Sequence, residues 1–186
     1  MESLIKQFMD RYEALNGVVH PVEGSNEAVR MVNSILKEAA AERIALAGLP
    51  PDLSNAIIKQ CEGDGIQVLR PPFNNSGLPH SIDTAEVGIT GAAFAIAETG
   101  TLVEFTRDDS LRLVSSLPEI HIGIIDAQDI IEKLFEAAAP IRDFYGQDPG
   151  NGVVTFISGP SRSGDIEMRL TLGVHGPRSS HAIVIR

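Results

Sequence analysis

Short apolar segments alternate along this chain with segments whose apolar residues recur at helical spacing. The strand-like segments are Arg43–Ala47, Ile66–Leu69, His121–Ile125, Val153–Ile157 and Ala182–Ile185. Strands that are apolar without alternation belong in a sheet covered on both faces, and such sheets are largely parallel because helices form the crossovers. The pattern therefore predicts an α/β fold with three layers, α/β/α, around a mostly parallel sheet.

Apolar residues at helical spacing predict helices near residues 4–15, 25–41, 52–62 and 127–138. The first two form an N-terminal helical part, residues 1–41, that packs on the rest. A chain of 186 residues without a dividing linker or internal repeat is the size of one domain, so we expect a single domain over residues 1–186. No apolar run approaches the ~20 residues of a membrane span, and the charged N-terminus leaves no core for a signal peptide. We therefore expect no membrane span.

The net charge and the cysteine content exclude several classes of function. The chain has 15 Lys and Arg against 25 Asp and Glu, a formal net charge of −10, which is the wrong sign for a nucleic-acid-binding protein. Its single cysteine, Cys61, falls on an apolar helix stripe, where a packed core residue is expected, and cannot alone ligate an iron–sulfur cluster. The histidines lack metal-ligand spacing, so no metal site is expected. These features suit a cytoplasmic protein whose electrons travel on another protein's cofactors.

The first candidate loop, residues 97–101, separates two apolar segments. Gly100 supplies the positive φ of a tight turn, so a hairpin explains it without any function. Glu98 follows a fully apolar segment, and a partly desolvated carboxylate there suits a nucleophile, a base or a ligand anchor. We therefore consider Glu98 a catalytic candidate, with Thr99, Gly100 and Thr101 as substrate-binding candidates.

The second candidate loop, residues 158–167, directly follows the segment Val153–Ile157. Its small residues let a ligand approach the backbone, and Ser161 and Ser163 can cap a following helix whose N-terminus attracts an anion. Arg162 offers a planar fork for a carboxylate or phosphate, although it could instead pair internally with Asp165 or Glu167. The substrate-binding candidates here are Gly159, Ser161, Arg162, Ser163, Asp165 and Glu167.

The third candidate loop, residues 173–178, precedes the last apolar segment. His175 lies between flexible glycines, where it could act as an acid, a base or a donor to a carboxylate. Gly176 and Arg178 complete the candidate set as ligand-binding residues. A solvated histidine in a Gly-Pro turn explains the same pattern without a function.

Taken together, these segments resemble the lactate-utilisation protein C family, the small members of the LUD-domain group. The resemblance covers about residues 87–186 and is carried by Val87–Thr90, Ala95–Leu102, Leu117-Pro118, His121-Ile122, Gly159–Arg162, Asp165–Glu167 and Gly173–Pro177. The chain has Ser163-Gly164 where the family more often has Thr-Ala, which preserves the hydroxyl.

This resemblance implies a fold like that of CoA-transferases and ribose-phosphate isomerase. It also implies a role in oxidising L-lactate to pyruvate, together with two partner proteins that carry iron–sulfur clusters, and no cofactor in this chain. The three candidate loops would then form one crevice.

Three functions remain open. In the first, this is a subunit of a lactate-oxidising assembly in which Arg162 holds an anionic small molecule while His175 or Glu98 assists proton removal. In the second, it is a CoA-ester or phosphometabolite enzyme with Glu98 as the covalent nucleophile. In the third, it is a non-catalytic binding or assembly module. The sequence leaves open whether the chain forms a homo-oligomer.

Overall fold

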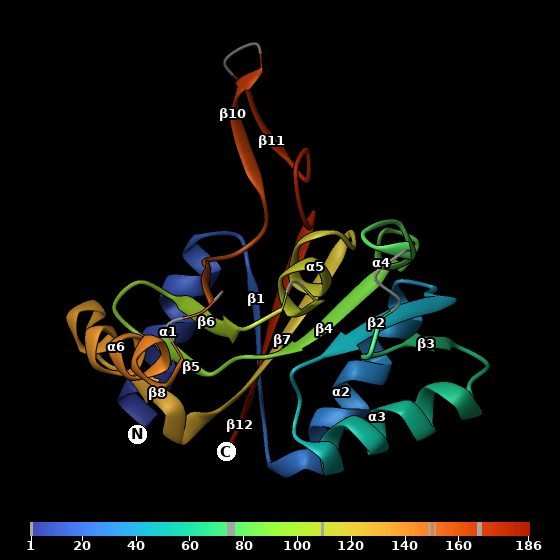
Figure 1. Ribbon diagram of the computed structural model, residues 1–186, viewed down its shortest axis with the longest axis horizontal. Coiled ribbons are helices and arrows are strands. Elements are labelled where there is room, and N and C mark those ends of the chain that lie inside the picture. The colour runs from blue at the N-terminus through green and yellow to red at the C-terminus, as the bar shows by residue number, and fades with distance from the viewer. Residues whose placement is uncertain (1, 74–76, 109, 149, 151, 167–168) are drawn as a thin grey trace.

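A parallel sheet forms the centre of the molecule. The computed structural model describes residues 2–73, 77–108, 110–148, 150, 152–166 and 169–186. Within these residues a six-stranded sheet has the order β1 (Val18–Val22), β12 (Ser179–Ile185), β7 (Ile120–Asp126), β4 (Val87–Gly91), β2 (Arg43–Ala47) and β3 (Gln67–Leu69) (Figure 1). Every neighbouring pair is parallel, which confirms the expectation from the apolar segments.

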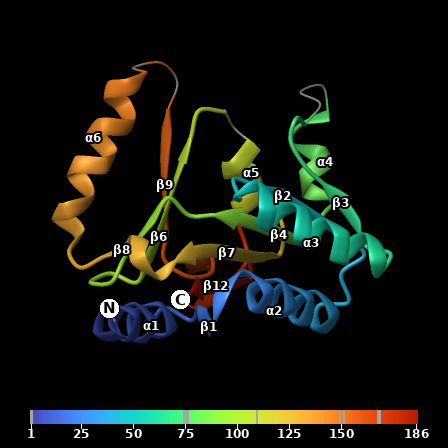
Figure 2. The same cartoon turned by 90° about the horizontal axis from the view of Figure 1, so that it is seen from below.

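Helices cover both faces of this sheet. Helices α2 (Gly24–Glu38) and α3 (Pro51–Gly63) pack on one face, where the free thiol of Cys61 is buried as expected (Figure 2). Helices α1 (Glu2–Ala14), α4 (His80–Asp83) and α5 (Ser110–Ser116) lie on the opposite side. Along β2 the two faces alternate, since Ile44 and Leu46 join the α2–α3 core while Ala45 and Ala47 join the α4–α5 core. The three-layer α/β/α arrangement is therefore confirmed.

A second, smaller sheet shares the layer of α1 and α5. Its order is β8 (Ile130–Ile131), β5 (Phe94–Ile96), β6 (Thr101–Thr106) and β9 (Val153–Ile157). Strand β6 lies close over β7 because Gly123 has no side chain, and a Cβ there would overlap Leu102 Cδ1. Helix α5 lies equally close to β4, where a Cβ on Gly88 would overlap the carbonyl oxygen of Val114. Small residues on this face of the main sheet thus allow a second layer to approach closely.

The expectation of one helix over residues 127–138 was wrong. Residues 127–138 do not form one helix but a 3-10 turn, η2 (Ala127–Asp129), then β8, then a second 3-10 turn, η3 (Leu134–Ala137). Pairing of β8 with β5 overrides the local helical spacing, and the regular helix, α6 (Ala138–Gln147), begins only afterwards. The N-terminal part also contains β1, an edge strand of the main sheet that includes Pro21.

Among the described residues from 158 onward, no helix follows the second candidate loop, so Ser161 and Ser163 do not cap one. Strands β10 (Arg162–Ile166) and β11 (Arg169–Leu172) form an antiparallel ribbon instead, in the register Arg162↔Leu172. Figure 1 shows this ribbon extending away from the body of the protein. Among the helices in the described ranges, none is long and apolar enough to cross a membrane.

Candidate functional site

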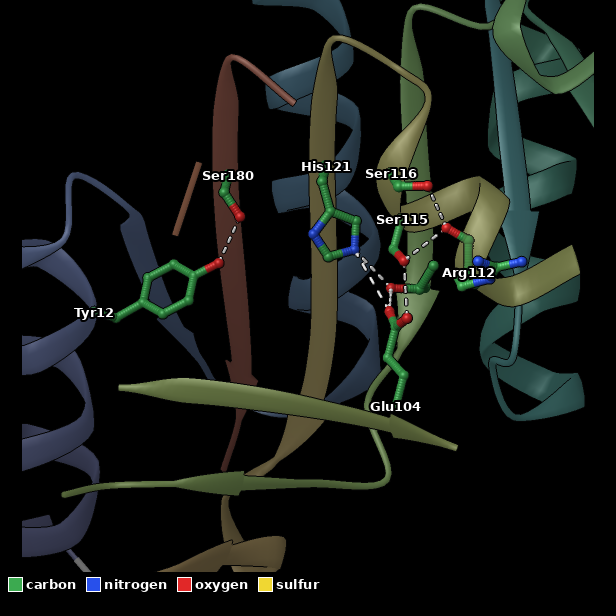
Figure 3. Close-up of polar contacts among 8 residues, drawn as sticks. Tyr12, Glu104, Arg112, Ser115, Ser116, His121 and Ser180 are labelled. Atoms are coloured by element: carbon green, nitrogen blue, oxygen red, sulfur yellow. Dashed lines mark hydrogen bonds and ion pairs between the residues drawn. The ribbon is translucent and has the colours of Figure 1, made fainter. Parts of the chain in front are cut away.

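A buried polar cluster lies between the main sheet and the layer formed by β6 and α5 (Figure 3). It contains Glu104 from β6, Thr90 from β4, His121 from β7 and Ser115 from α5. The side chains of Glu104 and His121 are each only 1% exposed. Polar groups are buried at such depth only when they bond to one another, because burial without partners is costly.

Hydrogen bonds join the four side chains into one chain. Thr90 Oγ1 lies 2.5 Å from Glu104 Oε1 and 2.7 Å from His121 Nε2. Ser115 Oγ donates to the other carboxyl oxygen, Glu104 Oε2, over 2.9 Å. Both oxygens of Glu104 and one nitrogen of His121 are therefore bonded, and the cluster links β4, β6, β7 and α5.

Burial sets the charges of this cluster. It raises the pKa of Glu104 from 4.5 to about 7, against the opposing effect of the hydrogen bonds from Thr90 and Ser115. It lowers the pKa of His121 from 6.5 to about 3, so the imidazole is neutral at physiological pH. The 3.8 Å approach of His121 Nε2 to Glu104 Oε1 is consequently no ion pair under those conditions.

A second buried pair stands beside His121. Tyr12 of α1 and Ser180 of β12 share a hydrogen bond of 2.6 Å, and Ser180 is the register partner of His121 on the neighbouring strand. Burial raises the pKa of Tyr12 to about 12, which keeps the phenol neutral. In the described part of the chain, His121 Nδ1 has no hydrogen-bond partner, and Figure 3 shows it on the side of Tyr12 and Ser180.

The sequence analysis missed this cluster. Glu104 is the one carboxylate in the apolar segment 102–105, and His121 begins an Ile-rich segment, so each was visible as a polar residue in a buried strand. Their convergence was not visible, because it depends on β6 crossing over β7 and on α5 packing against Gly88.

A cleft of about 520 Å³ opens at the carboxyl edge of the main sheet. Gly48 and Gly91 lie at the ends of β2 and β4, and three carboxylates, Asp52, Asp126 and Asp129, also line the cleft. Burial and the neighbouring Asp126 raise the pKa of Asp129, which marks this cleft as unfavourable for further negative charge. None of the described residues of the three candidate loops lines it.

A second cleft, also of about 520 Å³, lies at the amino edge of the same sheet. It contains His175 and Gly176 together with Ser116 at the end of α5 and Glu119 before β7. The second and third candidate loops meet beside it, because Ser161 N donates to Pro177 O over 2.8 Å and Gly173 N donates to Ser161 O over 3.0 Å. This part of the expected crevice is thus present.

The arginine candidates flank the amino-edge cleft. Arg178 lies against Gly173, and its backbone N–H donates to Glu119 O over 2.7 Å. Arg162, the residue after Ser161, starts β10, and both arginines are exposed. The side chains of Ser163 and Asp165 and the whole of Glu167 lie outside the described residues.

Glu98 lies away from the amino-edge cleft, although its loop contacts the second candidate loop through the hydrogen bond between Thr101 and Ser158. The side chain of Glu98 is 43% exposed rather than desolvated, and it lies 3.7 Å from Lys133 Nζ. Its Oε2 accepts the backbone N–H of Leu134 over 2.9 Å. These contacts direct Glu98 toward the segment before η3, and they do not favour a role as covalent nucleophile.

The other residues of the first loop serve the hairpin. Gly100 has a φ of 61° between the antiparallel strands β5 and β6, which confirms the turn. A Cβ on Gly100 would lie 2.5 Å from Tyr12 N, and a Cβ on Gly159 would lie 2.8 Å from Leu15 O, so both glycines permit close approach to the end of α1. Thr101 Oγ1 lies 2.7 Å from the hydroxyl oxygens of both Thr99 and Ser158. The hydroxyls of Thr99 and Thr101, expected to contact substrate, are therefore hydrogen-bonded to each other.

Metal binding requires several converging ligands. Across the described ranges, no three His, Cys, Asp or Glu side chains are gathered so that they could hold a metal ion.

Several proteins of known sequence or structure are similar to this chain. The chain is 40% identical to lactate utilization protein C of Shouchella clausii over 61% of its length, and 40% identical to that of Bacillus subtilis over 55%. It spans about half the length of these curated relatives, 51% and 43% respectively. A solved DUF162 family protein from Deinococcus radiodurans superimposes with a TM-score of 0.72 at 25% identity, covering 100% of this chain and 98% of the other.

The family model for the LUD domain matches residues 5–185, from α1 to the last residue of β12. This range includes both sheets, the buried cluster and both clefts. The match confirms the resemblance found in the sequence and extends it to the N-terminal part, and on this ground the chain belongs to the LUD domain family.

Proposed function

We propose that this chain takes part in L-lactate utilisation, as a subunit that acts with iron–sulfur partner proteins in the oxidation of L-lactate to pyruvate. The support is family membership together with 40% identity to a lactate utilization protein C over 61% of the chain.

The redox balance explains why partners are required. Oxidising lactate to pyruvate removes two electrons and two protons from the substrate. One buried cysteine is too few to ligate an iron–sulfur cluster, so the clusters that take the electrons belong to the partner subunits in this proposal. In this proposal the chain binds the substrate and accepts the hydroxyl proton, while the partner subunits take the two electrons and the second proton, from Cα.

The amino-edge cleft is the site that best fits an anionic 2-hydroxy acid. The observation that carries this choice is the pair of backbone hydrogen bonds joining the Ser161 loop to the His175 loop. Arg162 and Arg178 flank these loops and offer guanidinium groups to a carboxylate. The carboxyl-edge cleft is lined by three aspartates, whereas the amino-edge cleft is lined by two carboxylates, Asp83 and Glu119, and has Arg178 packed against its Gly173.

His175 is the proposed acceptor of the substrate hydroxyl proton. It lines the amino-edge cleft, whereas Glu98 is exposed and paired with Lys133. An imidazole is the side chain that most often serves as a general base in proteins. His175 therefore fits the role that the sequence left open between these two residues.

Reconstitution with the iron–sulfur subunits tests the proposal. The isolated chain should give no lactate-dependent dye reduction, and adding the partners should restore it. In the assembly, Arg162→Ala should raise the KM for lactate at least tenfold, and His175→Asn should lower kcat. Arg142→Ala, an exposed arginine on α6, is the matched control. Robust turnover by the isolated chain, or unchanged kinetics in both cleft variants, would contradict the proposal.

A second candidate function, partner binding without chemistry, is favoured by the ribbon of β10 and β11. Two-stranded ribbons are marginally stable alone in water, yet this one extends away from the body (Figure 1). An assembly role predicts that Arg162→Ala and His175→Asn leave lactate-dependent activity intact in the reconstituted complex. Shortening the ribbon would then abolish co-purification with the partners.

A further inference from the structure

The hydroxyl of Thr90 lies between Glu104 and His121 and forms a hydrogen bond with each. It lies 2.5 Å from Glu104 Oε1 and 2.7 Å from His121 Nε2. A hydroxyl has one proton, so it can donate to only one of these neighbours. The proton of the other hydrogen bond must then come from Glu104 or from His121.

Because Ser115 Oγ donates to Glu104 Oε2, the carboxyl proton can reside only on Oε1, and two arrangements satisfy this condition. When Glu104 is protonated, its O–H donates to Thr90 Oγ1, Thr90 donates to His121 Nε2, and the imidazole proton is on Nδ1. When Glu104 is ionised, Thr90 donates to the carboxylate, His121 Nε2–H donates to Thr90, and Nδ1 carries no proton. Ser115 donates to Glu104 Oε2 in both cases.

We propose that Thr90 couples the protonation state of Glu104 to the tautomer of His121, so that this buried chain is a proton-linked switch between two hydrogen-bond patterns. Conversion from the first pattern to the second releases one proton. The Glu104 proton moves to Thr90, the Thr90 proton moves to His121 Nε2, and the proton on Nδ1 leaves. Each internal proton advances one step, and the net change is the loss of one H⁺ to solvent.

The surroundings favour such a switch over simple titration of the imidazole. Tyr12 on α1, with a pKa raised to about 12, lies on the same face of the sheet as the cluster, while His181 on β12, with a pKa lowered to about 4, acts on His121 from the opposite face. Both are neutral near pH 7, as is His121 itself with its pKa of about 3. Helix α5 contributes Ser115, and its Arg112 accepts hydrogen bonds from Ser115 and Ser116 through the backbone oxygen. Glu104, with a pKa of about 7, is therefore the group that changes charge.

The unpartnered nitrogen of His121 has a place in this scheme. Nδ1 is buried and has no hydrogen-bond partner within the described residues, although buried polar atoms nearly always have one. In the proposed chain Nδ1 is the terminal position, where the proton is gained or lost. It lies on the side of Tyr12 and Ser180, two buried hydroxyls that are hydrogen-bonded to each other (Figure 3).

The switch also adjoins the amino-edge cleft. Ser115 binds Glu104, while the next residue, Ser116, lines the cleft that contains His175. A change at Glu104 therefore acts on Ser115, whose neighbour in the chain, Ser116, lines that cleft. The switch itself depends only on the buried contacts, so it can be tested without lactate or partner proteins.

Nuclear magnetic resonance of the full chain labelled with ¹⁵N-histidine tests the proposal. The chain has five histidines, and loss of a signal in His121→Gln assigns the relevant one. Between about pH 5 and pH 9, the His121 nitrogens should exchange their protonated and unprotonated chemical shifts, with a midpoint of about 7 and without forming imidazolium. Infrared difference spectra should show a protonated carboxyl band disappearing with the same midpoint.

Variants separate the switch from unrelated titrations. Glu104→Gln should abolish both the tautomer change and the carboxyl band. Thr90→Val should keep the carboxyl transition but uncouple His121 from it, and Thr106→Val, which removes another buried hydroxyl near Glu104 on β6, should leave both unchanged. A single His121 tautomer across the whole pH range, or a tautomer change that persists in Glu104→Gln, would overturn the proposal. If Glu104→Gln does not fold, the wild-type and Thr90→Val spectra decide the question alone.

Discussion

Glu98 and Glu104 occupy the same hairpin but have opposite environments. Glu98 lies in the turn before β6, 43% exposed, and interacts with Lys133 and the backbone N–H of Leu134. Glu104 lies within β6, 1% exposed, and is surrounded by hydroxyls and a neutral imidazole. A carboxylate is perturbed by the elements that cover it rather than by the apolar residues that precede it in sequence. The pKa of Glu104 reflects this environment, because burial raises it to about 7.

Replacing each carboxylate by alanine should produce the largest contrast. Near pH 6, Glu104→Ala should lower the free energy of unfolding by about 3–4 kcal/mol, because it leaves a cavity and removes the partner of Thr90 and Ser115. Glu98→Ala should lower it by less than about 1 kcal/mol. Urea denaturation of the two variants and the wild type measures both effects. Equal costs at the two positions would refute the contrast in environment.

The pH dependence of the free energy of unfolding should differ between the wild type and a variant that lacks the buried carboxyl of Glu104. The pKa of Glu104 is raised from 4.5 in the unfolded chain to about 7 in the native state. Between these values the native state binds more protons than the unfolded state, so stability falls as pH rises through this range, by about 3 kcal/mol in total from this group. Denaturant titrations across pH should show this loss in the wild type. Glu104→Gln, which cannot ionise, should lack it, and an identical profile would contradict the assignment.

The contrast also shows how far the sequence can be used for prediction. The parallel sheet could be predicted from apolar segments such as Arg43–Ala47, because strands buried on both faces are apolar at nearly every position. The hairpin turn at Gly100 could also be predicted, because it depends only on the residues next to it in the chain. The cluster around Glu104 could not be predicted, because it brings together strands and a helix whose packing depends on Gly88 and Gly123. The helix predicted near residue 130 failed for the same reason, since pairing with β5 is a long-range interaction.

Gly100 tests whether the constraint on the turn comes from packing. It has a positive φ, and a Cβ would lie 2.5 Å from the backbone nitrogen of Tyr12, so neither rotation nor a small shift relieves the clash. Gly100→Ala should therefore lower the free energy of unfolding by about 2–3 kcal/mol. Gly24 is the matched control, because it also has a positive φ but open space around it, and Gly24→Ala should cost about 1 kcal/mol. Thermal denaturation of both variants measures the difference.

The smallest effect is expected at the Glu98–Lys133 pair itself. The two side chains are 43% and 42% exposed and 3.7 Å apart, so solvent and salt screen their attraction. Glu98→Gln retains an oxygen for the Leu134 N–H, and it should change the free energy of unfolding by no more than about 0.5 kcal/mol. Lys133→Gln should have an effect of similar size, and the difference from wild type should shrink as salt is added. A cost well above this in Glu98→Gln, undiminished by salt, would mean that Glu98 is more deeply coupled to the fold than its exposure indicates.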